Sequence, residues 1–233
     1  MIWFILGSFL CIGFILAVRM GVLVWHIRHK RASFAWPPRD TTTKSSTQPA
    51  TPKKTLIVLG SGGHTSEMIQ LIRNLDAAEF YPLQFVKAAT DTTSVQRLHA
   101  AGIHTTQAVV VHEIPRAREV GQSYVSSIYS TLHAFVYALQ LMVIVRPDVL
   151  LCNGPGTCLP LCVAALLWRI VGLAAATRII FVESYCRVET MSLTGRLLYQ
   201  WVDLCCVHWP NLQTKYPLTT CISTMIRHDK KKQ

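Results

Sequence analysis

Acidic side chains are scarce in this sequence: Asp and Glu number 12 against 23 for Lys and Arg, which gives a formal net charge of +11. No pair of carboxylates is suited to hold a divalent cation, so we expect neither a metal nor another cofactor. The positive charge favours an anionic neighbour, either lipid headgroups or nucleic acid. Because the charge follows a hydrophobic run and no aromatic-basic recognition pattern is found, the sequence favours lipid and argues against nucleic acid.

Regular cysteine motifs are also absent. The eight cysteines form neither a metal-type Cys-x-x-Cys pair set nor a disulfide framework, and they lie mostly in apolar runs. We therefore expect small buried hydrophobic side chains in a reducing compartment rather than a zinc site. The length of 233 residues allows one globular domain with a membrane segment, but not comfortably two complete domains.

A hydrophobic run opens the chain. It is uncharged from Ile2 to Val18 and continues from Met20 to Trp25 after a single interruption at Arg19. Because about 17 to 25 apolar residues can cross a bilayer as a helix, residues 1–25 are predicted to be a transmembrane anchor, with the Arg19 guanidinium at the interface. A cleaved signal peptide is the alternative, but no basic segment precedes the run and no small-x-small cleavage site follows it.

Basic residues follow this run at once. Arg28, Lys30 and Arg31 are expected to stay in the cytosol by the positive-inside rule, which places the bulk of the chain there as well. Residues 26–54 are predicted to be a cytosolic linker, because the stretch from Ala32 to Lys54 is rich in Pro, Ser and Thr and has almost no apolar periodicity.

Short β-rich runs alternate with longer helical runs in the rest of the chain. This alternation is typical of a parallel sheet covered on both faces by helices, so the predicted fold class is α/β, with a single Rossmann-like domain over residues 55–217. The predicted strands are residues 55–59, 82–90, 106–114, 148–152, 178–184 and 202–207. The predicted helices are residues 66–75, 94–102, 123–145 and 159–176.

The predicted helix at residues 159–176 has a second interpretation. It carries a single charge, Arg169, and could be a second membrane span. Its place between two strands and the charge in its middle favour a crossover helix of the core, with partial membrane contact left open.

Glycines cluster directly after the first predicted strand, in the stretch TLIVLGSGGHTSEM. They let the backbone approach a ligand, and the following helix offers free N–H groups to an anion. Thr65 replaces the third glycine of a dinucleotide turn, and His64 replaces the lysine of a P-loop, which argues against a nicotinamide cofactor and against a P-loop triphosphate. A tight turn without a ligand is the alternative. The residues predicted to bind the anion are Gly60, Ser61, Gly62, Gly63 and Thr65.

His64 is expected to face the same crevice, where its imidazole could take up a proton near neutral pH. A hydrogen-bonded structural histidine is the alternative interpretation. The position of His64 at the mouth of a glycine-rich loop makes it a candidate general base.

Two later loops are expected at the same carboxyl edge of the sheet. The stretch IPRAREVGQS places Arg116 and Arg118 in a loop, where arginines suit phosphate oxygens, although a solvated charged loop is equally compatible. The stretch CNGPGTCLP repeats the order of strand, glycine bend and helix. Its predicted substrate-binding residues are Asn153, Gly154, Gly156 and Thr157.

The stretch VESYCRVETMSLTG adds polar residues at the end of the next strand. Ser184 is predicted to bind substrate, and Glu183 is a second candidate for the catalytic base. An internal ion pair between Glu183 and Arg187 is the alternative for this carboxylate.

Taken in order, GSGGHTSEM, IPRAREVGQS, CNGPGTCLP, VESYCRVETMSLTG and HWPNLQTKYP cover nearly all of residues 55–217. This series closely resembles the asparagine-linked glycosylation protein 14 family, the membrane-anchoring subunits of a two-subunit UDP-N-acetylglucosamine transferase. The Gly-Gly-His loop also resembles, more distantly, the acceptor half of the bacterial glycosyltransferase that makes the lipid-linked peptidoglycan disaccharide.

The resemblance implies half of a GT-B glycosyltransferase at the endoplasmic reticulum membrane, single-pass, with the soluble domain on the cytosolic face. A soluble partner subunit would bind UDP-N-acetylglucosamine, and this chain would hold the dolichol-linked acceptor, whose pyrophosphate would meet the loop from Gly60 to His64. The implied chemistry is inverting transfer of the second N-acetylglucosamine. Its base would be His64 or Glu183.

The end of the chain departs from the family pattern. Residues 218–233 are expected to dock the partner, but Ser223 stands where the family has glycine and a basic extension follows from Arg227. Two other functions stay open: a non-catalytic adaptor that only recruits a complete enzyme to the membrane, and a nucleotide-dependent oxidoreductase. The missing third glycine counts against the oxidoreductase.

Overall fold

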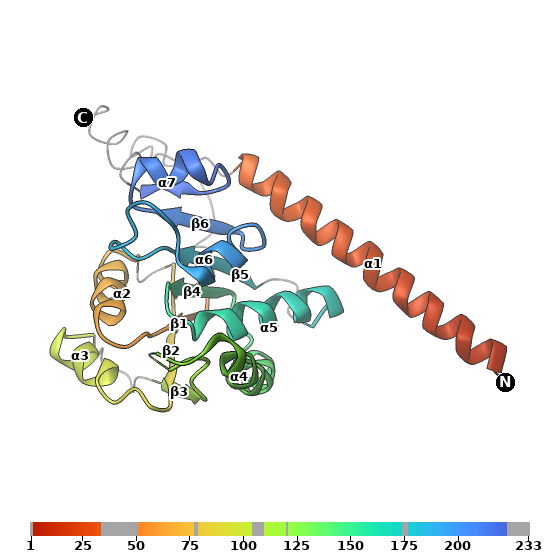
Figure 1. Ribbon diagram of the computed structural model, residues 1–233, viewed down its shortest axis with the longest axis horizontal. Helices are drawn as coiled ribbons and strands as arrows, with labels where there is room; N and C mark the ends of the chain where they lie inside the picture. The colour runs from red at the N-terminus through yellow and green to blue at the C-terminus, as the bar shows by residue number, and fades with distance from the viewer. Residues whose placement is uncertain are drawn as a thin grey trace.

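The computed structural model describes residues 2–33, 51–76, 79–103, 110–119, 121–173 and 177–222. A sheet of seven parallel strands in the order β3-β2-β1-β4-β5-β6-β7 lies at its centre (Figure 1). The strands are β1 (Thr55–Val58), β2 (Leu83–Ala88), β3 (Val110–Ile114), β4 (Val149–Asn153), β5 (Arg178–Val182), β6 (Leu204–Val207) and β7 (Thr220–Cys221). The helices are α1 (Ile2–Ser33), α2 (Gly63–Arg73), α3 (Ser94–Ala100), α4 (Tyr124–Val145), α5 (Cys158–Val171), α6 (Leu193–Leu198) and α7 (Pro210–Lys215).

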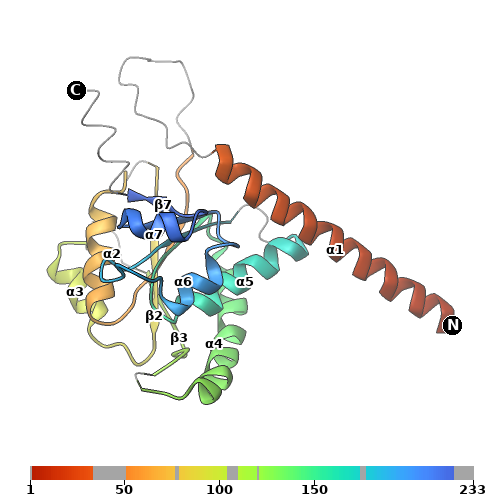
Figure 2. The ribbon, with the colours of Figure 1, turned by 45° about the horizontal axis from the view of Figure 1, so that its top comes forward.

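The central strands are apolar on both sides because helices cover both faces of the sheet. α2 and α3 lie on one face, and α4, α5 and α6 lie on the other (Figures 1 and 2). Neighbouring residues of β1 therefore enter different cores: Leu56 and Val58 pack with residues of α4 and α5, while Ile57 packs with residues of α2. This two-sided burial confirms the α/β class predicted from the sequence.

All six predicted strands and all four predicted helices of the domain are found, with shifts of a few residues at their ends. The expected strand at residues 106–114 is described only from Val110, and residues 174–176 of the expected helix also lie outside the described part of the chain. Three short elements, α6, α7 and β7, were not predicted. Of these, β7 pairs with β6 and forms the edge of the sheet.

α5 connects β4 to β5 and is the crossover helix that the sequence favoured. Arg169, near its end, is buried and makes a bidentate ion pair with Asp203, at 2.7 and 3.1 Å. Asp203 also accepts a hydrogen bond from the backbone N–H of Ile179 at 2.8 Å. The ion pair thus holds α5 to the segments that lead into β5 and β6.

α1 is a continuous helix that projects from the domain beside α5 (Figure 1). It continues over residues 26–33, which were expected to begin the linker, because no Pro or Gly occurs between Trp25 and Ser33. The Arg19 guanidinium donates to the carbonyl of Val171 at 3.0 Å, at the carboxyl end of α5. Arg19 therefore caps the carboxyl end of α5, and its position at the membrane interface stays a prediction. Residues 34–50 of the expected linker lie outside the described residues.

Over Val125–Val145, α4 is long and apolar enough to cross a membrane, and 28% of that stretch is buried. Ala134, Ala138 and Met142 pack into the core, while the opposite side of the helix is exposed and apolar. Because β3 and β4, which flank α4, belong to the same sheet, α4 connects strands of one domain rather than crossing a bilayer. The large exposed apolar residues of α4 are Val125, Ile128, Tyr129, Leu132, Val136, Tyr137, Val143 and Ile144.

The cysteines are free thiols, and six of the eight are buried as expected. Cys11 and Cys186 are the exceptions, since both are exposed. Burial raises the pKa of Cys152 and Cys158 and raises the pKa of Cys206 to about 12. These buried thiols are therefore protonated, unreactive parts of the core.

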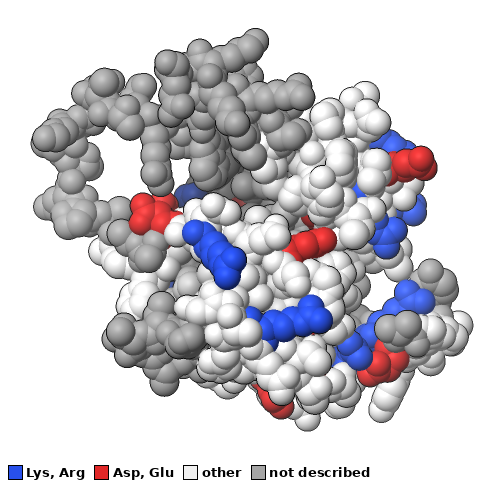
Figure 3. All heavy atoms as spheres, turned by 90° about the vertical axis from the view of Figure 1, so that its left-hand side faces the viewer, with Lys and Arg blue, Asp and Glu red and all other residues white. Residues whose placement is uncertain are grey.

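Charged side chains on the face that carries α2 and α3 are mixed in sign. Figure 3 shows Lys and Arg side chains on the described part of this face interspersed with Asp and Glu rather than joined in one continuous stripe. This arrangement does not resemble the clustered basic stripe of a nucleic-acid-binding domain.

Candidate functional site

The candidate site lies where the order of the strands reverses. β1 and β4 are neighbours, and the chain continues from β1 toward β2 on one side and from β4 toward β5 on the other. The loops after these two strands therefore diverge and leave a crevice at the carboxyl edge of the sheet, the usual ligand position in open α/β sheets. The glycine loops from Gly60 to Gly63 and from Gly154 to Thr157 both lie there.

Close packing and backbone conformation explain the glycines of the first loop. A Cβ added at Gly60 would lie 2.7 Å from Pro155 of the second loop, so the two loops touch at this point. Gly62 has a φ of +68° and precedes α2 without a side-chain cap. Neither Gly62 nor Gly63 has an atom within 4 Å of the Cβ position, which leaves the backbone at the start of α2 open to a ligand.

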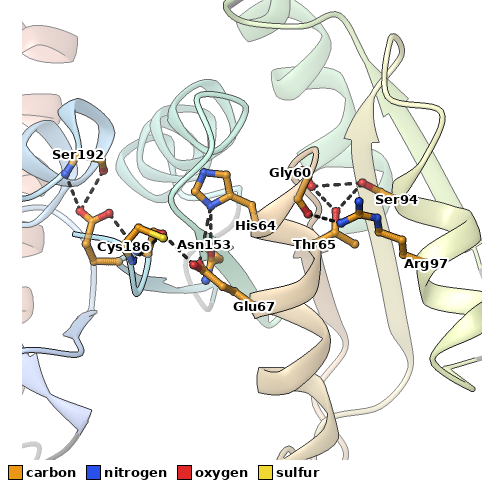
Figure 4. A network of polar contacts seen from close by, with 12 residues as sticks. Gly60, His64, Thr65, Glu67, Ser94, Arg97, Asn153, Cys186 and Ser192 are labelled. Atoms are coloured by element: carbon orange, nitrogen blue, oxygen red, sulfur yellow. Dashed lines mark hydrogen bonds and ion pairs between the residues drawn. The ribbon is translucent and has the colours of Figure 1, made fainter. Parts of the chain in front are cut away.

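A network of buried hydroxyl groups holds this loop in place (Figure 4). The Thr65 hydroxyl donates to the carbonyl of Gly60 and lies 2.7 Å from Ser94 Oγ, which in turn donates to Asp91. Burial alone would raise the pKa of Asp91, but the hydrogen bonds from Ser94 and Thr93 outweigh it and lower the pKa. Thr65 is fully buried, so its side chain supports the loop and does not face the crevice.

The second loop positions His64. Asn153, the last residue of β4, is buried and its Oδ1 lies 3.1 Å from Nδ1 of His64. Gly154 has a φ of +64°, and a Cβ there would come within 2.9 Å of the imidazole ring. The second loop thus packs directly against the imidazole of His64. Gly156 and Thr157 follow in the same loop, at the start of α5.

A pocket of about 340 Å³ opens beside His64. Glu67, one helical turn after His64, lies in its wall with Oε2 at 3.8 Å from His64 Nδ1. The Ser184 hydroxyl donates to Oε1 of Glu67 at 2.8 Å. The pocket is lined by Gly63, His64, Glu67, Gly154, Glu183, Ser184, Cys186, Arg187 and Ser192.

The carboxylate of Glu183 is not free to accept a proton from a substrate, as a catalytic base would be. Its side chain is fully buried, and its carboxylate accepts hydrogen bonds from the backbone N–H of Ser184 at 3.0 Å and from the N–H and hydroxyl of Ser192 at 2.9 and 3.0 Å. Ser192 caps α6 by accepting from the N–H of Gly195. Among the described residues no ion pair joins Glu183 to Arg187, so the alternative interpretation of this carboxylate is wrong. Glu183 fixes the start of α6 beside the pocket.

Two arginines reach the first glycine loop, and only one of them was expected. Arg116 donates to the Ser61 hydroxyl at 3.0 Å and pairs with Glu119 at 2.9 Å. Arg97 of α3, which the sequence did not single out, donates to the carbonyl of Gly62 at 2.7 Å. Arg118 donates to the carbonyl of Gln122 at 3.1 Å, within its own loop.

His208 follows β6 and interacts electrostatically with Glu67. Burial lowers the pKa of His208, and the negative charge of Glu67 acts in the opposite direction. The part of the chain that the structure describes has no group of three His, Cys, Asp or Glu side chains that could hold a metal ion. The titratable side chains that line the pocket are His64, Glu67, Glu183, Cys186 and Arg187.

The sequence profile described as "Oligosaccharide biosynthesis protein Alg14 like" matches residues 55–225. The UDP-N-acetylglucosamine transferase subunit ALG14 of Rattus norvegicus is 40% identical over 189 residues, which are 76% of this chain and 87% of the rat protein. The human protein of the same name is 40% identical over 73% of this chain and 82% of its own length. The Yarrowia lipolytica protein is 40% identical over 70% of this chain and 77% of its own.

A solved structure shares the fold. MurG from Acinetobacter baumannii matches with a TM-score of 0.51 and 17% identity, covering 69% of this chain but only 43% of MurG. The chain thus spans less than half of that structure, and the likeness concerns the fold alone.

Proposed function

The chain belongs to the Alg14 family of oligosaccharide biosynthesis proteins, and on this premise we propose that it is the acceptor-side, membrane-anchoring subunit of a UDP-N-acetylglucosamine transferase. It would recruit a soluble, donor-binding subunit to the endoplasmic reticulum membrane. Together the two would add the second N-acetylglucosamine to N-acetylglucosaminyl-pyrophosphoryl-dolichol.

The observation that carries this proposal is the meeting of two glycine loops around His64. The open backbone at Gly62 and Gly63 offers the first N–H groups of α2, and the positive end of its dipole, to the acceptor pyrophosphate. Arg116, at the side of Ser61, adds a cation. His64 stands at the edge of the pocket next to these groups, where the acceptor sugar would follow its pyrophosphate.

In the proposed reaction the 4-hydroxyl of the acceptor sugar attacks the anomeric carbon of the donor. The oxygen–carbon bond forms as the bond to UDP breaks, and the leaving electron pair goes to the UDP phosphate. His64 takes the hydroxyl proton, a contribution of about 10² to 10⁴ in rate. The second candidate, Glu183, has each of its oxygens in hydrogen bonds to its own protein, which makes it the weaker choice.

The anchor places the pocket near lipid. Residues 1–25 would cross the membrane once, and the basic residues up to Arg31 would hold the domain on the cytosolic face. α4, which has many exposed apolar side chains, lies on the same side of the sheet as α5, beside which α1 projects (Figures 1 and 2), so the same membrane would contact α4 as well.

Transfer of radiolabelled N-acetylglucosamine from UDP to a phytanyl-pyrophosphate-linked N-acetylglucosamine tests the proposal. The chain co-expressed with its donor-binding partner should form product, and the chain alone should not. His64→Ala in the same complex should lower kcat by about 10² or more. Full activity of a folded, partner-bound His64→Ala complex would favour the adaptor that touches no substrate.

A further inference from the structure

Glu67 lines the pocket of the candidate site, but the proposed reaction does not use it. It follows His64 by three residues on α2, so both side chains project from the same side of the helix. Its Oε1 accepts the hydrogen bond from Ser184 Oγ at 2.8 Å, and this contact aims the other oxygen at the imidazole. Oε2 is buried, lies 3.8 Å from His64 Nδ1 and has no hydrogen-bond partner. A buried carboxylate oxygen without a donor is costly unless it serves the site.

The surroundings of His64 Nδ1 decide which ring nitrogen carries the proton. Nδ1 faces Oδ1 of Asn153 at 3.1 Å and the carboxylate of Glu67 at 3.8 Å. An ionised carboxylate only accepts hydrogen bonds, whereas a neutral imidazole has one donor and one acceptor nitrogen. The proton of neutral His64 is therefore favoured on Nδ1, and the lone pair is left on Nε2, which Figure 4 shows on the side of the ring away from Asn153 and Glu67.

We propose that Glu67 is the positioning carboxylate of the base: held by Ser184, it keeps the proton of neutral His64 on Nδ1 and so leaves Nε2 free to accept the proton of the acceptor hydroxyl. This inference rests on the proposed function and on His64 as its base. The proton moves from the hydroxyl oxygen to Nε2, and the carboxylate of Glu67 stabilises the imidazolium that forms. Glu67 itself neither gains nor loses a proton, as in other pairs of imidazole and carboxylate.

Kinetics of the reconstituted complex test the inference first. Glu67→Gln keeps the size of the side chain but replaces an oxygen with an NH₂ donor, and we expect kcat to fall about 10- to 10³-fold with a much smaller change in KM. Glu79→Gln is the matched control. Glu79 is exposed, lies at the amino edge of the sheet away from the pocket, and forms a long ion pair of 3.6 Å with Lys53. It should retain the activity of the parent chain.

A double variant separates positioning from a merely structural role. If Glu67 acts through His64, then adding Glu67→Gln to His64→Ala should cost no further activity, because residues that work as a unit are not additive. If Glu67 only supports the fold, the two losses should multiply, and that result would overturn the inference. Ser184→Ala removes the hydrogen bond to Oε1 together with the long one, 3.4 Å, that Ser184 Oγ accepts from the N–H of Cys186. It should give a smaller loss of kcat that is likewise absent in the His64→Ala background.

Nitrogen NMR of the full chain labelled with ¹⁵N-histidine gives a readout that does not depend on activity. The parent chain should show neutral His64 protonated at Nδ1, and Glu67→Gln should shift the population toward the Nε2 tautomer. An unchanged tautomer in folded Glu67→Gln would contradict the inference. Absence of sugar transfer by the parent complex, with the tautomer shift present, would instead reject the proposed function alone.

Discussion

At the scale of single residues, two glycines of one loop have different surroundings. A Cβ added at Gly60 would lie 2.7 Å from Pro155 and 2.9 Å from the Cβ of His64, whereas one added at Gly63 has no atom within 4 Å. We expect Gly60→Ala to lower the free energy of unfolding by about 1 to 3 kcal/mol, the usual cost of overpacking. Gly63→Ala should leave it unchanged or raise it by up to about 1 kcal/mol, because alanine reduces the entropy of the unfolded chain.

Thermal unfolding of the detergent-solubilised chain, followed by circular dichroism, compares these two variants. The two substitutions add the same methyl group three residues apart in the sequence, so each controls for the other. Equal shifts of the unfolding temperature would show that the contact between the two glycine loops does not set the cost.

A half-buried histidine makes stability depend on pH. Nε2 of His112, on β3, lies 2.9 Å from Oε1 of Gln84, and burial lowers the pKa of His112 below its ordinary value of 6.5. The unfolded chain therefore binds this proton more readily than the folded chain. The contribution to stability is complete above pH 6.5 and is lost as the pH falls through the folded pKa.

We therefore expect the unfolding temperature to drop as the pH falls below about 6.5. His112→Gln keeps a hydrogen-bonding side chain but does not titrate, so it should make this drop in unfolding temperature smaller. It should not abolish it, because burial also lowers the pKa of His208. An identical pH dependence in the variant would contradict the assignment.

Some site residues could be predicted from the sequence and others could not. The glycines and His64 could be predicted because they directly follow a buried strand. Several glycines next to a histidine in so short a loop are unusual. Glu67 lies inside a helix among residues with ordinary helical spacing, and its role depends on Ser184, 117 positions away. Thr65 was predicted to face the ligand, but the sequence does not reveal that Ser94 and Asp91 bury its hydroxyl.

At the scale of elements, the ion pair of Arg169 and Asp203 joins α5 to the start of β6. Arg169 and Asp203 have side chains only 6% and 17% exposed, so removal of one partner leaves a charge buried without compensation. We expect Asp203→Ala to lower the free energy of unfolding by about 3 to 5 kcal/mol. The exposed pair of Lys53 and Glu79, 41% and 49% exposed, is the control, and Glu79→Ala should cost less than about 1 kcal/mol. Thermal unfolding measures both variants. Similar losses of stability in Asp203→Ala and Glu79→Ala would contradict the prediction that the ion pair of Arg169 and Asp203 holds α5 in place.

The strands and long helices were predictable because each carries a strong local pattern. β1 and β4 are unbroken apolar runs, as two-sided burial requires, and α2 shows helical periodicity. α6 and α7 have six residues each and β7 has two, which is too short for a period to appear. α6 also contains Gly195, a poor helix former that is needed there because a Cβ would lie 2.3 Å from Glu183 Oε2.

At the scale of the whole molecule, α1, the proposed anchor, and α4 are the two elements that we expect to meet a membrane. The exposed side chains of α4 recur at helical spacing, and no charged residue lies between Tyr124 and Val145. Such an apolar stripe on a domain tethered beside lipid is more stable against the bilayer surface than in water, by about 1.5 to 3 kcal/mol for each large side chain that is fully buried. We therefore expect α4 to contact lipid in the full chain.

Photocrosslinking in vesicles measures this contact. A photoreactive benzoylphenylalanine at Ile128, which is 62% exposed on α4, should capture radiolabelled phospholipid severalfold more than the same group at Gln70, an exposed residue of α2 on the other face of the sheet. A third probe at Ile15 of α1 reports that the chain is inserted, because this residue lies within the proposed anchor. Strong labelling at Ile15 with equal, weak labelling at Ile128 and Gln70 would mean that the anchor alone meets the bilayer and that the apolar side of α4 belongs to another interface.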